Sequence, residues 1–399
     1  MGGADGLRAI QLLLAVYPQA ARKKDSGGYL PLHSVAQYMS GIEGLQAIQL
    51  LLAENPQAVM EKTTDGWLPL HIVAQFMGGA EGLQAIQLLL AEYPQAAKEK
   101  TPDGCLPLHL VASKKGGAEG LQAIQLLLAE YPQAAQVRDP DGALPLHLAS
   151  NMGGTVGVHA TQLLLLEYPA AAKVKSPDGW LPLHYVARHI GGTECLQAIQ
   201  LLLLEYPAAA KAKSPDGDLP LHLVAHHMAG AEGLQAIQLL LAENPQAVME
   251  KTTDGWLPLH LVACHMGGAE GLQAVRLLLA EYPQAAKERN AEGWLPLHLV
   301  AHHMGGAEGL QAVRLLLKEY PQAVEEKDSD GELPIHHICQ NENATLDMVR
   351  ELLSAHPEGI NVRSNENATP YMMAACIKRL PSVAIDFLRH AEEGESIFM

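Results

Sequence analysis

The chain has 399 residues and a formal net charge of −17, because 44 Asp and Glu side chains outnumber 27 Lys and Arg side chains. A nucleic-acid backbone or an anionic membrane surface requires a basic face on the protein that binds it, so we expect no nucleic acid and no membrane as a partner. The sequence also lacks the run of roughly 18 apolar residues that a membrane-spanning helix needs.

The cysteines favour a reducing compartment. Five cysteines are present, and no two of them form a Cys-x-x-Cys pair. The N-terminus lacks the basic and apolar segments of a secretion signal. We therefore expect a protein that is cytoplasmic, with the nucleus as the alternative, and not secreted.

The first predicted element is a helix over about residues 6–16. The tetrapeptide at the start, Met1-Gly2-Gly3-Ala4, recurs as Met77-Gly78-Gly79-Ala80 in the middle of a longer unit. Residues 1–28 are therefore predicted to be a half-repeat whose helix has no neighbour on its outer side. Two explanations stay open: the array continues before Met1 in a longer protein, or this helix caps the array and exposes apolar surface.

Residues 29–366 are predicted to be an array of repeats. The motif Leu-Pro-Leu-His recurs in steps of 38 residues, with one step of 37, and a ninth copy reads Leu-Pro-Ile-His. Residues 43–71 and 232–260 are identical, so part of the similarity reflects duplication, and the positions at which repeats differ are the more informative ones. The nine motif histidines, called the signature histidines below, are His33, His71, His109, His147, His184, His222, His260, His298 and His336.

One unit extends over residues 65–102. Its Asp65-Gly66 predicts a turn, since glycine accepts a positive φ. A first helix is expected from Pro69 to Met77, because proline is tolerated at the first helical position, and a glycine pair follows it. A second helix is expected from about Leu83 to Tyr93, followed by an extended return to the next turn. Such a unit cannot bury its leucines alone, so we expect the units to stack on one another.

The segment Leu257-Pro258-Leu259-His260-Leu261-Val262-Ala263 is similar to the Thr-Pro-Leu-His-x-Ala signature of ankyrin repeats. The resemblance covers nearly the whole chain, with leucine in place of threonine and a period of 38 instead of 33 residues. It implies an all-α repeat solenoid, an ankyrin-like superhelix of stacked helix–loop–helix units with short turn tips. About four of the extra residues fall in the segment between the helices, and the rest near the Tyr-Pro pair. Tetratricopeptide or HEAT repeats explain the helices but not the turn and the Leu-Pro-Leu-His entry.

Residues 367–391 are predicted to be a C-terminal capping repeat, because its second helix, from about Pro381 to Ala391, is more polar than those of the array. Residues 392–399 are predicted to be a flexible acidic tail.

The signature histidines are predicted to be structural. A histidine at the start of each first helix can satisfy backbone groups of adjoining turns, and the ankyrin resemblance implies the same role. The sequence contains no phosphate-binding, dinucleotide-binding, nucleophile-elbow or zinc-protease motif, so we expect neither an enzyme nor a cofactor.

Candidate partner-binding residues occupy three positions of the repeat. The first is the residue after the turn, called the turn tip, where all four tryptophans of the chain lie. The other two lie four and five residues after the signature histidine, and in ankyrin-type modules all three line the concave recognition surface. Tryptophan at a turn tip is either an interface anchor or packs on the neighbouring turn, and the sequence leaves both open. The candidates are Tyr29, Trp67, Trp180, Trp256 and Trp294 at the tips, and Gln37, Tyr38, Gln75, Phe76, Arg188, His189, His226, His227, His265, His302 and His303 at the other two positions.

Metal binding by this histidine ladder is disfavoured. Neighbouring repeats are separated by roughly 8–10 Å, whereas Zn–N bonds are about 2.0–2.1 Å, so three successive histidines do not converge on one ion. Adjacent residues of a helix point about 100° apart, so His226 and His227 are expected not to share a site. A surface that responds to pH is the better prediction.

The predicted function is a non-enzymatic scaffold or adaptor that binds another protein on its concave face and turn tips. The negative net charge favours a partner with a basic patch. Two alternatives stay open: a regulatory or targeting repeat region of a larger enzyme whose catalytic domain precedes Met1, and a histidine-rich metal-binding array. The sequence does not specify an oligomeric state.

Overall fold

The computed structural model describes residues 3–114, 116–189 and 192–394, and all regular elements of this part are α- or 3₁₀-helices. Met1 and Gly2 of the predicted half-repeat and residues 395–399 of the predicted tail lie outside the described residues. The chain divides into two compact units: Met1–Val186 with Leu204–Tyr206, and Ala187–Leu203 with Pro207–Met399. None of the described helices combines the length and the apolar character that crossing a bilayer requires.

Each first helix begins at the proline of the repeated motif, as predicted. The leucine before the proline is extended, with φ −81° and ψ 157° at Leu68, and proline fits the first helical turn because that turn needs no N–H donor. The first helices are α2 Pro31–Tyr38, α4 Pro69–Phe76, α6 Pro107–Ala112 and α8 Pro145–Ser150 in the first unit, α10 Pro182–Arg188 at the division, and α12 Pro220–His227, α14 Pro258–His265, α16 Pro296–His303, α18 Pro334–Ile338 and α20 Pro370–Ile377 in the second.

The second helices begin one turn earlier than predicted. The segment expected to be an inter-helix loop enters the helix at Gly79, and the loop shrinks to Met77 and Gly78, because Gly82 N–H already donates to Gly78 C=O. The second helices are α3 Gly41–Glu54, α5 Gly79–Glu92, α7 Ala118–Glu130, α9 Gly154–Glu167, α11 Thr193–Glu205, α13 Gly230–Glu243, α15 Gly268–Glu281, α17 Gly306–Glu319, α19 Leu346–Ala355 and α21 Ser382–Glu392; α1 Gly3–Val16 precedes them.

The predicted extended return is wrong over most of its length. A 3₁₀-helix follows α1 and each second helix from α3 to α19. It begins at the proline of the Tyr-Pro or equivalent pair, where Ala96 N–H donates to Tyr93 C=O and Ala96 and Ala97 are buried. These helices are η1 Pro18–Arg22, η2 Pro56–Met60, η3 Pro94–Lys98, η4 Pro132–Gln136, η5 Pro169–Lys173, η6 Pro207–Lys211, η7 Pro245–Met249, η8 Pro283–Lys287, η9 Pro321–Val324 and η10 Pro357–Asn361.

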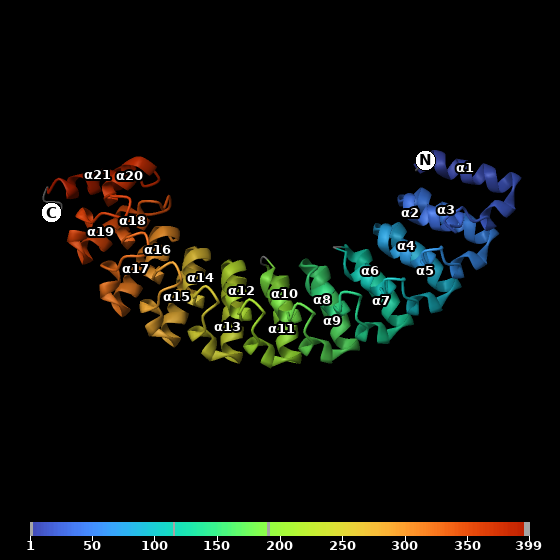
Figure 1. The fold of residues 1–399 in the computed structure, drawn as a ribbon, viewed down its shortest axis with the longest axis horizontal. Helices are drawn as coiled ribbons and strands as arrows, with labels where there is room; N and C mark the ends of the chain where they lie inside the picture. The colour runs from blue at the N-terminus through green and yellow to red at the C-terminus, as the bar shows by residue number, and fades with distance from the viewer. Residues whose placement is uncertain (1–2, 115, 190–191, 395–399) are drawn as a thin grey trace. The chain divides into compact units, whose positions relative to one another are not determined.

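Within each unit the first helices pack in one row and the second helices in another (Figure 1). In the second unit α13 packs on α12 of its own repeat and on α15 of the next, and its Leu234, Ile237 and Leu240 are buried. The leucines of one repeat are therefore covered by its neighbours, as the stacking prediction requires. In the first unit α1 packs on α3, while its Leu12 and Val16 are 62% and 86% exposed.

The signature histidines hold the repeats together through both ring nitrogens. His260 Nδ1 accepts the Leu257 N–H at 3.0 Å, and its Nε2 donates to Glu288 C=O in the approach to the next repeat at 3.0 Å. His71 repeats this pattern with Leu68 and Glu99. The structural role predicted for these histidines is confirmed, and it requires the neutral imidazole, because a protonated Nδ1 cannot accept a hydrogen bond.

Candidate partner-binding surface

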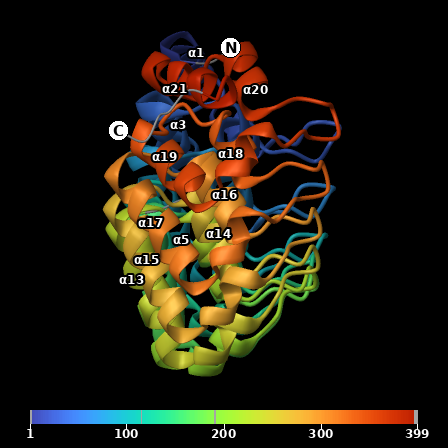
Figure 2. The same cartoon turned by 90° about the vertical axis from the view of Figure 1, so that its left-hand side faces the viewer.

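The turn tips are fixed in place by the turn that precedes them. Thr252 Oγ1 accepts the N–H of Trp256 at 3.1 Å, and Gly255 adopts φ 77°, which glycine tolerates best. A Ser, Thr, Asp or Asn side chain makes the same bond in the other repeats, as Thr63 does to Trp67. In each unit the turns therefore project together to one side of the helices (Figure 2).

The tryptophans at the tips are half-buried, each against a different set of rings. Trp67 and Trp256 meet their signature histidines edge to face, with ring centroids 6.1 Å apart in both pairs. Trp180 also contacts Tyr185, at 5.6 Å. Trp294 lies 4.3 Å from His337 of the next repeat and is thereby tied into the packing between repeats.

In the first unit, neighbouring tips and helices enclose an apolar groove of about 160 Å³, and four of the predicted residues line it. Beside it, Tyr38 is 74% exposed, and Phe76 in its wall is 51% exposed. The Oε1 atom of Gln37 is buried without a hydrogen-bond donor. Gln75 is half-buried and is not part of this wall. The groove is lined by Tyr29, Gln37, Trp67, Ile72 and Phe76.

In the second unit, a larger groove of about 480 Å³ lies between the turns and first helices of two repeats. It brings together Trp256, His226, His227 and His265 from the predicted set. It also contains three carboxylates that the prediction missed, Asp216, Asp218 and Asp254. Asp218 stands at a turn tip, and Asp216 and Asp254 belong to the Asp-Gly turns. These acids are visible in the sequence, but an Asp-Gly pair predicts a turn and does not by itself indicate a binding groove.

The groove in the second unit is negative at neutral pH. Burial, together with Asp216 and Asp254, raises the pKa of Asp218. Burial lowers the pKa of His265 to about 4, with further lowering from nearby histidines, and also lowers the pKa of His226. These imidazoles are therefore neutral at pH 7 and leave the charge of the carboxylates uncompensated.

The prediction that His226 and His227 diverge is wrong. Their Nδ1 atoms are 3.2 Å apart and their ring centroids 4.2 Å apart. The two residues are the last of α12, and the chain becomes extended at Met228, so the side chains are not held apart by a following turn of helix. Burial lowers the pKa of His227, and so do His226, Arg188 and His189 in that order. These four predicted residues therefore lie close enough to interact electrostatically.

A second histidine group, of predicted and unpredicted members, surrounds the end of α16. His302 and His303 have ring centroids 4.4 Å apart, and His302 Nδ1 lies 3.5 Å from Nδ1 of the unpredicted His337. Burial and then His303 lower the pKa of His302 to about 4. Nowhere in the described part of the chain do three ladder histidines bring their donor atoms within 4.8 Å of one another.

Two rows of paired helices, joined by a histidine in each repeat and by turns on one side, define a helical repeat protein. Residues 225–323 match the family of ankyrin repeats, in 3 copies. These residues are therefore ankyrin repeats, and the other described repeats are built from the same helical units. Ankyrin repeats are in general modules of protein–protein interaction without enzymatic activity. No curated protein matches the chain.

Proposed function

We propose that the chain is a non-enzymatic scaffold that binds a protein partner at its turn tips and first helices, and that the groove of the second unit takes a basic side chain of this partner. The observation that carries the proposal is the cluster of Asp216, Asp218 and Asp254 beside Trp256 in a groove of about 480 Å³.

The three carboxylates have no basic partner within the described residues. The nearby lysines are already engaged, since Lys213 pairs with Glu250 and Lys251 with Glu288, both at 2.7 Å. A guanidinium or ammonium group from a partner supplies the missing charge and lies against the indole face of Trp256, which attracts cations. A positive segment is thereby favoured over a neutral or acidic one.

The apolar groove of the first unit favours a second kind of contact. Tyr29, Trp67 and Phe76 surround space for an apolar side chain, and aromatic side chains of this type are frequent anchors at interfaces. Five free thiols support a reducing compartment, the cytosol or the nucleus, as the place of this interaction.

The test uses two fluorescein-labelled peptides of equal length, one with arginines alternating with leucines and one with glutamates in their place, titrated against the full chain by fluorescence anisotropy. We expect the arginine peptide alone to bind. Asp218→Asn should weaken it about 10- to 100-fold, since hydrogen bonds to charged groups contribute about 1.5–3 kcal/mol. Trp256→Ala should weaken it as well.

Asp103→Asn is the matched control, because Asp103 is an exposed turn residue of the first unit that does not line this groove. Equal binding of both peptides, or equal loss in the Asp218 and Asp103 variants, contradicts the proposal.

A further inference from the structure

The repeat that contains α18 differs from its neighbours at three positions at once. Where the preceding repeat has Asn290, Trp294 and Leu299, this repeat has Asp328, Glu332 and His337. Leucine or another apolar residue stands at the position of His337 in most repeats, next to the signature histidine. Three ionisable side chains have therefore replaced non-ionisable ones within a frame that otherwise repeats.

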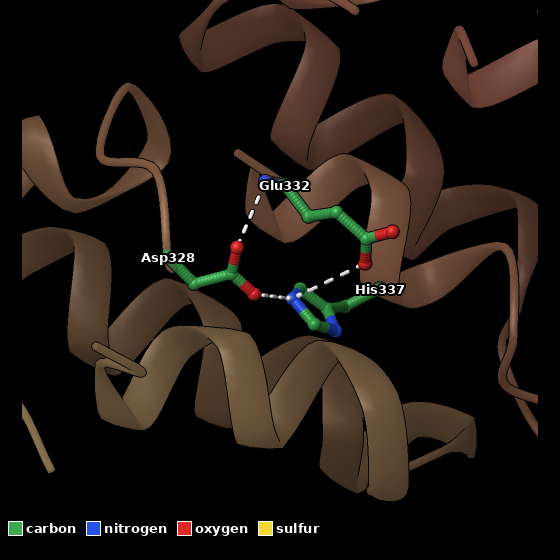
Figure 3. A group of neighbouring side chains, drawn as sticks. All are labelled: Asp328, Glu332 and His337. Carbon is green, nitrogen blue, oxygen red and sulfur yellow. Dashed lines mark hydrogen bonds and ion pairs between the residues drawn. The ribbon is translucent and has the colours of Figure 1, made fainter. Parts of the chain in front are cut away.

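These three side chains converge although they come from a turn, a turn tip and a helix (Figure 3). Asp328 Oδ2 lies 2.8 Å from His337 Nε2, and Glu332 Oε2 lies 3.7 Å from the same nitrogen. One donor atom from each residue lies within 4.8 Å of the other two. The side chains of Asp328 and His337 are 0% and 2% exposed, and that of Glu332 is 13% exposed, so the cluster reaches the surface through Glu332.

The two carboxylate oxygens of Asp328 make different hydrogen bonds. Oδ1 accepts the backbone N–H groups of Asp330 and Glu332 at 2.9 and 2.8 Å, which is the turn-forming role this position has in every repeat. Oδ2 is not needed for the turn and faces His337. In the repeat of Asn290 the corresponding atom is a buried amide nitrogen without a partner, so the turn forms without any contribution from this second atom.

The cluster carries more negative charge than its imidazole can balance. Glu332 makes no ion pair other than the 3.7 Å contact to His337 in the part of the chain that the structure describes. The carboxylates of Asp328, Asp330 and Glu366 lie close enough to repel the carboxylate of Glu332. A divalent cation between the two carboxylates relieves this repulsion.

The imidazole of His337 is also held as a metal ligand would be. Its ring lies against Trp294, with centroids 4.3 Å apart, and its second nitrogen, Nδ1, faces His302 Nδ1 at 3.5 Å. Nε2 donates its hydrogen to Asp328 Oδ2 at 2.8 Å, so a metal ion bound at Nε2 takes the place of this proton. The ring hydrogen then lies on Nδ1, the nitrogen that metal-ligating histidines usually direct toward a hydrogen-bond partner.

We propose that Asp328 Oδ2, Glu332 Oε2 and His337 Nε2 bind a first-row transition-metal ion of the Zn²⁺ type, with water completing the coordination. Ligand atoms around a tetrahedral Zn²⁺ are about 3.3 Å from each other, and the distances of 2.8 and 3.7 Å straddle this value, so a small rotation of Glu332 suffices. One imidazole with two carboxylates suits Zn²⁺ better than Ca²⁺ or Mg²⁺, which prefer oxygen ligands alone. The ion joins the turn tip to α18 and thereby stabilises this repeat. The site is separate from the groove proposed for the partner and does not rest on it.

The test titrates the untagged full chain with Co²⁺, whose visible absorption reports coordination, and then displaces Co²⁺ with Zn²⁺. We expect one Co²⁺ per chain in this site and a rise of the thermal midpoint with Zn²⁺. The variant Asp328→Asn/His337→Leu restores two residues of the preceding repeat and should fold, yet lose the Co²⁺ band and the thermal shift.

Glu332→Gln leaves the bond between Asp328 and His337 intact and should weaken metal binding about 10- to 100-fold, so it tests the site even where the double variant fails to fold. The control His226→Asn/His227→Asn removes the other close histidine pair and should leave the absorption unchanged. The proposal is overturned if the chain takes up no Co²⁺ at micromolar concentration, if Asp328→Asn/His337→Leu or Glu332→Gln retains the full band, or if the control loses it.

Discussion

The signature histidines should make the second unit unstable in mild acid. Burial is the main reason that the pKa values are low, at about 4 for His222, His260 and His336 and about 3 for His298. In the unfolded chain these groups return to about 6.5, the ordinary value for histidine. As the pH falls below 6.5 the unfolded chain therefore binds protons that the folded unit excludes, and stability is lost until the pH reaches the folded pKa values.

The magnitude follows from the size of these shifts. Between pH 7 and pH 5, one histidine with a folded pKa near 4 and an unfolded pKa near 6.5 loses about 2 kcal/mol of stability. Four of them in one cooperative unit lose on the order of 7 kcal/mol, which is comparable to the whole stability of an ordinary domain. This loss of stability does not include His265 and His302, because both are partly exposed and solvent screens their contribution.

Urea unfolding followed by circular dichroism at pH 7, 6 and 5, at constant ionic strength, measures this loss directly. Histidine Hε1 resonances of the folded chain provide a second measurement, since the signature rings should not titrate above pH 5. His260→Leu should lower stability at pH 7 by about 2–5 kcal/mol, because it leaves the Leu257 N–H and the Glu288 C=O buried without partners, and it should also flatten the pH dependence. Free energies that stay constant between pH 7 and 5, or signature resonances that titrate near 6.5, would refute the reasoning.

Two further predictions concern the turn and the thiols. Gly66→Ala should destabilise the first unit by about 2 kcal/mol, since Gly66 has φ 77° and a Cβ there would lie 2.7 Å from Pro102 Cγ. Gly120→Ala is its control in urea unfolding, and should raise stability by about 0.5–1 kcal/mol, because Gly120 is helical and no described atom lies within 4 Å of an added Cβ. In labelling with a thiol reagent, the exposed Cys376 should react rapidly, while Cys339, fully buried and with a pKa raised by that burial, should react only after unfolding; rapid labelling of Cys339 in the folded chain would contradict its burial.

The repeated features could be predicted because each is dictated locally. The proline that begins α4, the glycine with positive φ at Gly66 and the histidine bonds of His71 need only a few neighbouring residues, so the sequence motif predicts them in every copy. The 3₁₀-helices were missed for a different reason. The Pro-Gln-Ala-Ala pattern after Tyr93 has no apolar period longer than one turn, and the helix depends on burial of Ala96 and Ala97 between repeats.

The candidate site was less predictable because its geometry depends on side chains from several elements. A helical wheel places His226 and His227 about 100° apart. At the end of a helix, however, the side-chain rotamers determine where the rings lie, and here they bring the two rings together. The cluster of Asp328, Glu332 and His337 escaped notice because its members are nine and five residues from the histidine, a spacing that matches no known motif. Alignment of the repeats would have shown it, because only this copy combines acidic residues at both turn positions with a histidine after the signature histidine.

The division between fixed and variable positions explains how one frame supports different sites. The bonds of His260 run to backbone atoms alone, the Leu257 N–H and the Glu288 C=O, so they do not depend on which side chain stands at a neighbouring turn tip. A change at a tip therefore alters the surface without disturbing the stack, provided that it leaves no buried charge unpaired. Asp218 satisfies this condition by lying in an open groove, and Glu332 by lying beside His337.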